Sequence, residues 1–156
     1  MACPNKVSLK VLVQLRTNWQ SIYDFGAQED AEWNQYLNVL YPSEEDMQRI
    51  RNRDVLAVLE QNGDTLTPVR DVHHWIYFRS RESRESFASE AQELGYKIED
   101  QTERTGEERP FGLIITRDQS LTQQAIDEAV IELFRLAEEV DAEYDGWEAQ
   151  LISTKN

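Results

Sequence analysis

The sequence has 156 residues, enough for one domain with an appendage, and its 30 acidic and 16 basic residues give a net charge of −14. This charge repels phosphate backbones and anionic membranes, so general nucleic-acid binding and membrane binding are disfavoured. The single cysteine, Cys3, excludes an internal disulfide framework and a cysteine-rich zinc site. No apolar run is long enough to span a membrane, and no secretory core follows Met1. We expect a reduced, cytoplasmic protein.

The first 42 residues combine two patterns. From Val7 to Leu15 apolar residues alternate with polar ones, as in a strand, whereas from Leu12 to Tyr23 they also fit one helical face. Residues 33–40 again show helical spacing, which Pro42 ends. We predict a mostly helical N-terminal extension, residues 1–42, packed on or beside the domain that follows.

A helix is predicted from Ser43 to about residue 61. Ser43 can accept from free backbone N–H groups, and the acids of Glu44-Glu45-Asp46 suit the positive end of the helix dipole. Asn62-Gly63-Asp64 ends the helix, with Gly63 in a left-handed conformation. Its expected apolar side consists of Met47, Ile50, Val55, Leu56 and Leu59.

The next segments alternate between strand and helix patterns. Val72 to Phe78 is rich in aromatic and β-branched residues and predicts a strand, after which Ser80 or Ser83 caps a helix that ends at Gly95. Residues 96–99 alternate as in a second strand. A polar turn at 105–108 precedes the near-continuous apolar run of residues 111–116, which is typical of a central strand.

The last part of the chain contains the clearest helix. Ser120-Leu121-Thr122-Gln123 matches the capping-box pattern, and a long apolar stripe follows at helical spacing. Residues 143–152 complete the pattern as a strand. The stripe consists of Ile126, Ala129, Val130, Leu133, Ala137 and Val140.

The order of these elements over residues 71–152 is βαββαβ. We therefore predict an α+β fold: a ferredoxin-like sandwich with two helices on a four-stranded antiparallel sheet, preceded by the extra N-terminal helical segment. The domain is expected to span residues 43–152, and residues 153–156 form a tail. The second sheet face is either open or covered by the N-terminal segment.

Acidic residues gather around the last helix. Between Asp127 and Glu148 only Arg135 opposes them, so this surface is either a solvated face or a docking surface for an arginine-rich segment. The acids are Asp127, Glu128, Glu132, Glu138, Glu139, Asp141, Glu143, Asp145 and Glu148.

The string Tyr144-Asp145-Gly146-Trp147 has two interpretations. In the structural one, Gly146 marks a bulge or close backbone approach, the two aromatic residues are core or sheet-face anchors, and Asp145 accepts backbone hydrogen bonds. In the functional one, the string forms an exposed aromatic and acidic patch that docks a partner.

Enzymatic and metal chemistry have little support. His73 and His74 are adjacent on a strand, so their side chains point to opposite faces and cannot readily bind one metal. No nucleophile elbow, P-loop or dinucleotide fingerprint is present. The run from Arg109 to Ile114 superficially resembles an RNA-recognition strand, but Leu113 and Ile115 cannot stack on bases. We predict no catalytic residue, no metal, no cofactor and no direct nucleic-acid binding.

Residues 141–147, Asp-Ala-Glu-Tyr-Asp-Gly-Trp, resemble the closing motif of the regulator of ribonuclease activity B family, which inhibits ribonuclease E. The segments Leu59-Glu60-Gln61-Asn62-Gly63-Asp64, Val72-His73-His74 and Leu94-Gly95-Tyr96 resemble the family in the same order, so the likeness covers about residues 43–152. This resemblance implies a non-enzymatic bacterial protein that binds ribonuclease E and changes which RNAs are cut.

We therefore hypothesise a regulator that binds a protein partner, with the oligomeric state left open. A small-ligand-binding ferredoxin-like module is the alternative, which requires a concave apolar pocket lined by the sheet and the N-terminal aromatic residues. An enzyme is a third hypothesis, which requires a cleft where a histidine meets two carboxylates. The expected partner-binding residues are Asp127, Glu128, Glu132, Glu138, Glu139, Tyr144, Asp145 and Trp147.

Overall fold

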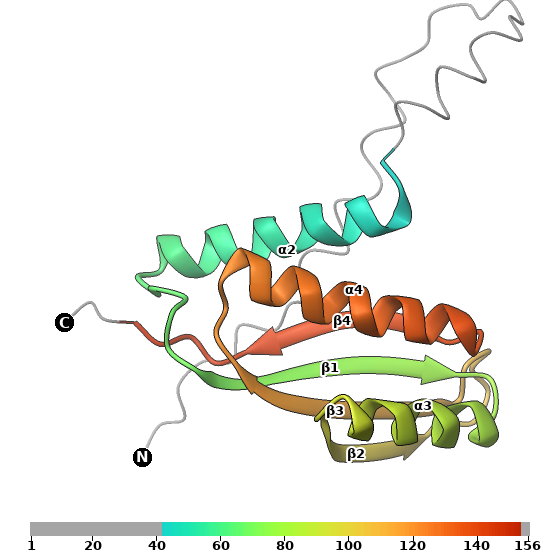
Figure 1. The fold of residues 1–156 in the computed structure, drawn as a ribbon. Coiled ribbons are helices and arrows are strands. Elements are labelled where there is room, and N and C mark those ends of the chain that lie inside the picture. The colour runs from blue at the N-terminus through green and yellow to red at the C-terminus, as the bar shows by residue number, and fades with distance from the viewer. Residues whose placement is uncertain (1–41, 154–156) are drawn as a thin grey trace, which may run out of the picture. The chain divides into compact units, whose positions relative to one another are not determined.

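The computed structural model describes residues 42–153, so the predictions for the extension 1–42 and the tail 153–156 lie almost wholly outside the described residues. In chain order the elements are α2 (Glu44–Gln61), β1 (Arg70–Phe78), α3 (Arg81–Glu93), β2 (Lys97–Glu103), β3 (Phe111–Gln119), α4 (Gln123–Glu139) and β4 (Glu143–Ala149) (Figure 1).

The four strands form one antiparallel sheet in the order β2-β3-β1-β4. Helix α3 packs on β1, β2 and β3, α4 packs on β4, and α2 packs against α4 (Figure 1). The α+β class and the βαββαβ order from β1 to β4 are thereby confirmed. No helix within residues 42–153 is both long and apolar enough to cross a membrane.

Helix α2 begins and ends where its sequence predicts. The Ser43 hydroxyl accepts from the Asp46 N–H at 3.1 Å while the Asp46 carboxylate accepts from the Ser43 N–H at 3.3 Å, which completes a capping box. Gly63 has φ +90° just after the helix, as expected for a left-handed stop. The predicted apolar side of the helix is only partly right, because its buried residues are Gln48, Asn52 and Leu56.

Helix α4 starts two residues later than the capping-box pattern predicts. Its N-cap is Thr122, whose hydroxyl accepts from the Ala125 N–H at 3.4 Å. Leu121 is fully buried, and its N–H donates to the Leu66 carbonyl at 2.7 Å, so this residue is held outside the helix. Ser120 is therefore too far back to act as the cap.

Two strand boundaries also differ from the prediction. Strand β2 runs to Glu103 rather than residue 99, because its polar residues pair with β3 along an edge that needs no apolar alternation. Strand β4 ends at Ala149 rather than residue 152. The N–H of Ile152 instead donates to the Asp64 carboxylate at 2.9 Å, which draws this segment away from the ladder.

The core lies between the sheet and the helices. Along β1 the fully buried residues Val72, Ile76 and Phe78 alternate with half-buried ones that face away from the helices. Phe87 of α3 meets Phe78 edge to face, with ring centroids 5.3 Å apart. The interior thus fixes the α4 backbone in place and leaves the outer side of that helix for other contacts.

Candidate functional site

Helix α4 is amphipathic, with apolar side chains on its buried side and acidic ones on its outer side. The predicted apolar stripe is buried from Ile126 to Ala137, and Val140 forms the C-cap. The predicted acids lie on the remaining surface: Glu128, Glu138 and Glu139 are exposed, whereas Asp127 and Glu132 are partly buried.

A groove of about 540 Å³ runs along this outer side of α4, between α2 and α3. Ile131 and Leu136 supply apolar lining, and Leu94 at the end of α3 adds an apolar side chain that is 41% exposed. Of the predicted site residues, the groove brings together Asp127, Glu128, Glu132 and Glu139. Its other charged lining residues are Arg49, Glu90 and Arg135.

The groove acids differ in how firmly they are held. Glu132 lies 3.5 Å from the Arg117 guanidinium and accepts from the Tyr96 hydroxyl at 3.5 Å. Asp127 accepts from Asn52 and Gln123 amides, both at 2.8 Å. These two carboxylates therefore have structural partners.

Among the described residues, Glu128 accepts only from the neutral Gln124 amide, at 2.9 Å. Within residues 42–153 neither Glu138 nor Glu139 forms an ion pair, so these exposed charges are available to a partner. Arg135, the single base of the helix, is held by the Glu45 carboxylate at 2.6 Å and 2.9 Å. The Arg135 hydrogen bond is also the main reason that the pKa of Glu45 is lowered.

The Tyr144–Trp147 string is built around a β-bulge. Trp75 of β1 pairs with Gly146 and Ile76 pairs with Tyr144, so Asp145 is the extra residue. Three residues apart on a regular strand, Tyr144 and Trp147 would point to opposite faces. The bulge instead turns both toward the helices, which is the structural interpretation of this motif.

Both aromatic residues of that string are buried, with 7% and 6% of their surface exposed. The Tyr144 hydroxyl is 2.8 Å from Nδ1 of the buried His74, and the Trp147 indole N–H donates to the Asn52 side chain at 2.9 Å. Neither side chain belongs to an exposed docking patch. Of the predicted motif residues only Asp145 is exposed.

Asn52 is a residue that the sequence interpretation missed. It joins Asp127 of α4 to Trp147 of β4 while being 2% exposed itself. A signal was available, because Gln48, Asn52 and Leu56 follow each other at four-residue intervals and so share one helix face. Two amide side chains on that face indicate hydrogen bonds to neighbouring elements, whereas the apolar pattern alone predicts only apolar packing.

The structure also bears on the two other hypotheses. His74 is fully buried, and burial, followed by the charges of Arg117 and His73, lowers its pKa to about 3, so it stays neutral. It meets tyrosines rather than the two carboxylates that the enzyme hypothesis requires. Within residues 42–153 no cluster of three His, Cys, Asp or Glu could hold a metal ion.

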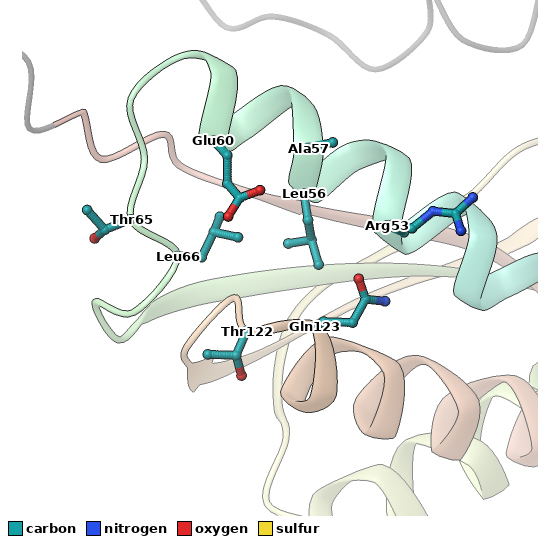
Figure 2. A pocket seen from close by; sticks show the side chains of 8 residues that line it. All are labelled: Arg53, Leu56, Ala57, Glu60, Thr65, Leu66, Thr122 and Gln123. Carbon is teal, nitrogen blue, oxygen red and sulfur yellow. The ribbon is translucent and has the colours of Figure 1, made fainter.

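A second cavity, of about 330 Å³, lies between the C-terminal half of α2, the loop at residues 65–66 and the start of α4. Figure 2 shows Leu56 and Leu66 in its centre, with Arg53, Glu60 and Gln123 around them. Its lining comes from helices and loops rather than from the sheet, so it is not the sheet-lined pocket that the small-ligand hypothesis requires.

Comparison with known proteins gives a consistent match. The sequence pattern of the family described as regulator of ribonuclease activity B matches residues 49–149, from α2 through β4. Proteins of that name from Escherichia coli K12 and Shigella flexneri are each 31% identical over 108 residues, covering 68% of this chain and 78% of theirs. The protein of the same name from Salmonella typhi is 31% identical over 102 residues, covering 64% and 74%.

Proposed function

The chain belongs to the regulator of ribonuclease activity B family, and from that premise we propose that it is a non-enzymatic protein that binds a ribonuclease and lowers its activity. Ribonuclease E is the partner that the family resemblance implies. The proposal includes a cytoplasmic location, in keeping with an RNA-processing partner and a single cysteine.

The observation that supports this proposal is the groove on α4. Acidic side chains outnumber basic ones along it, and Ile131, Leu136 and Leu94 give it an apolar floor. A helix or extended segment with apolar residues on one side and arginines beside them would match both properties. We therefore assign the contact with the ribonuclease to this groove and to a basic, amphipathic segment of that enzyme.

The fold family is part of the same proposal. The strand order β2-β3-β1-β4, together with two helices that cross over one sheet face, supports the ferredoxin-like assignment. That scaffold places α4 on the outside of the sheet, where a partner can reach the groove. Residues 43–152 would be the complete binding unit.

The proposal is tested by calorimetry with purified ribonuclease E at low and moderate salt. Glu128→Lys with Glu139→Lys reverses two exposed groove charges, neither of which is in an ion pair within residues 42–153. We expect affinity to fall by about tenfold or more at low salt, with a smaller loss at high salt because ions screen the attraction.

The matched control is Glu85→Lys with Glu99→Lys, which changes net charge equally on exposed residues outside the groove. This control should bind nearly as the parent does. Equal losses in the two double variants would show that only net charge matters and would contradict the groove assignment. Absence of a complex with the parent protein at low salt would contradict the function itself, and RNA cleavage with and without the protein would give an independent readout.

A further inference from the structure

The sheet face opposite the helices carries a row of aromatic side chains. His73, Trp75 and Tyr77 of β1 alternate with the buried core residues, and each is half-buried. The His73 and Trp75 rings lie side by side, with centroids 6.2 Å apart. No helix of residues 42–153 covers this face, because α3 and α4 pack on the other side and α2 packs on α4 (Figure 1).

The neighbours of Trp75 leave room beside its ring. Its cross-strand partners are Ile114 on β3 and Gly146 on β4. A side chain built on Gly146 would meet no described atom within 4 Å, so the space at the bulge is open. Gly112 beside Tyr77 differs, because Thr102 already fills the corresponding space. Of these two glycines of the sheet, only the one opposite Trp75 has free space beside it.

Carboxylates surround this aromatic row and outnumber its bases. Asp71 and Asp118 face each other directly across β1 and β3, an unfavourable pairing of like charges. The bases are Lys97, which forms an ion pair with Asp118 at 3.5 Å, Arg109, which forms one with Glu143 at 3.5 Å, and Arg104. The carboxylates at register positions of this face, or at the bulge beside it, are Asp71, Asp100, Asp118, Glu143, Asp145 and Glu148.

One guanidinium already lies on the row. The Arg104 guanidinium carbon is 5.9 Å from the centroid of the Tyr77 ring, within cation–π range. The larger Trp75 ring has no such cation among the described residues, although it is the better acceptor of one. Asp145 precedes Gly146 at the bulge. Glu148 lies opposite His73 in the register of β1 and β4, next to Trp75.

We propose that this sheet face, which no described helix covers, is a second docking surface, on which an arginine of a protein partner stacks on Trp75 beside Gly146 while Asp145 and Glu148 pair with its charge. An RNA base could also stack on the ring, but its phosphates would meet the surrounding carboxylates. The surface therefore favours an arginine-bearing peptide over a nucleic acid. The site is separate from the α4 groove, so either of the two proposals can be wrong while the other holds.

The test is a titration of the full-length, isotope-labelled protein followed by amide and indole NMR signals. The probe is a nine-residue peptide of alternating arginine and glycine, compared with its lysine counterpart and with a ten-nucleotide oligouridylate. We expect the arginine peptide to shift the signals of Trp75, Tyr77 and Gly146 while the indole signal of Trp147, bonded to Asn52, stays in place. The lysine peptide should bind about threefold more weakly.

Variants separate stacking from general attraction. Trp75→Leu should weaken the arginine peptide about fivefold, and Glu148→Gln, which keeps the ring and the fold, should weaken it about twofold. Glu128→Lys with Glu139→Lys in the α4 groove should leave the Trp75 shifts unchanged. Shifts confined to α4, unchanged affinity in both sheet variants, or tighter binding of the oligouridylate than of the peptide would each overturn the proposal.

Discussion

At the scale of single residues, Asp64 and Arg70 form a buried ion pair. The Arg70 guanidinium bonds both carboxylate oxygens of Asp64, one of them at 2.9 Å, and also donates to the Gln150 carbonyl at 2.9 Å. The same carboxylate accepts from the N–H groups of Leu66 at 2.8 Å and Ile152 at 2.9 Å. Two charged side chains thus hold the loop after α2 against the segment after β4.

Asp64→Asn should lower the free energy of unfolding at pH 7 by about 3 kcal/mol, because it leaves Arg70 buried without its counter-charge. Burial alone would raise the pKa of Asp64, but the Arg70, Ile152 and Leu66 hydrogen bonds lower it from 3.8 to about 2. A lowered folded-state pKa means that this stabilisation, about 2 kcal/mol, is present above pH 3.8 and is lost as pH falls through about 2.

Urea unfolding from pH 7 to pH 2 measures this effect. The difference in the free energy of unfolding between the parent and Asp64→Asn should become smaller below about pH 4. Asp54→Asn is the control, since Asp54 pairs with Arg53 at 3.8 Å on an exposed surface and should change stability by less than about 1 kcal/mol. A constant gap down to pH 2 would show that Asp64 does not carry the charge.

At the scale of elements, α2 is attached to the rest of the domain through a polar seam. Asn52 donates to Asp127 of α4 and accepts from the Trp147 indole of β4, so one side chain joins three elements. At the outer end of the seam, the Glu45–Arg135 pair adds a second link between α2 and α4. This position of α2 also brings Arg49 to the groove on α4.

Asn52→Ala should destabilise the domain by about 2 kcal/mol, because the buried Trp147 N–H and Asp127 both lose a partner. Denaturant unfolding followed by tryptophan fluorescence measures the loss. Gln61→Ala, on an exposed position of the same helix, should leave stability nearly unchanged. If Asn52→Ala had the same free energy of unfolding as the parent, the two Asn52 hydrogen bonds would contribute nothing to stability.

Local patterns predicted the elements of residues 42–153 well and their connections less well. Burial follows directly from residue spacing in two elements: the apolar stripe from Ile126 to Ala137 and the alternating residues of β1. The Thr122 cap depends on a bond from Leu121 to the distant Leu66, and the end of β4 depends on Asp64. Such long-range contacts leave no mark in local spacing.

The same contrast holds for the candidate site. The excess of acids around α4 is visible in the sequence, but the groove is not, because Arg49 and Leu94 reach it from α2 and α3. The bulge could be suspected from Gly146, whereas the burial of Tyr144 and Trp147 depends on His74 and Asn52. Sequence thus predicts the charge of the surface, and structure assigns each charge a partner or leaves it available.

At the scale of the whole molecule, acidity and one buried histidine set the response to pH. His74 stays neutral in the folded protein because its pKa is lowered to about 3, whereas in the unfolded chain it gains a proton below about pH 6.5. Unfolding therefore takes up a proton between these values. The contribution of His74 is fully present above pH 6.5 and declines as pH falls, by about 1.4 kcal/mol per pH unit.

His74→Gln should remove that dependence. Unfolding free energies at pH 7, 6 and 5 should fall more steeply for the parent than for the variant, although the variant starts lower because Tyr144 loses its imidazole partner. This window lies above the one expected for Asp64, so the two effects are measured separately. Parallel pH profiles between pH 6.5 and 5 would contradict a buried neutral histidine.

The seam between α2 and β4 also has a consequence for synthesis on the ribosome. Asn52 and Trp147 are 95 residues apart, so α2 leaves the ribosome long before its hydrogen-bond partner exists. At translation rates of about 5 to 20 residues per second that interval is about 5 to 20 s. During it, the Asn52 side chain lacks the Trp147 indole to which it is bonded in the folded domain. The domain can close only when its last strand has emerged.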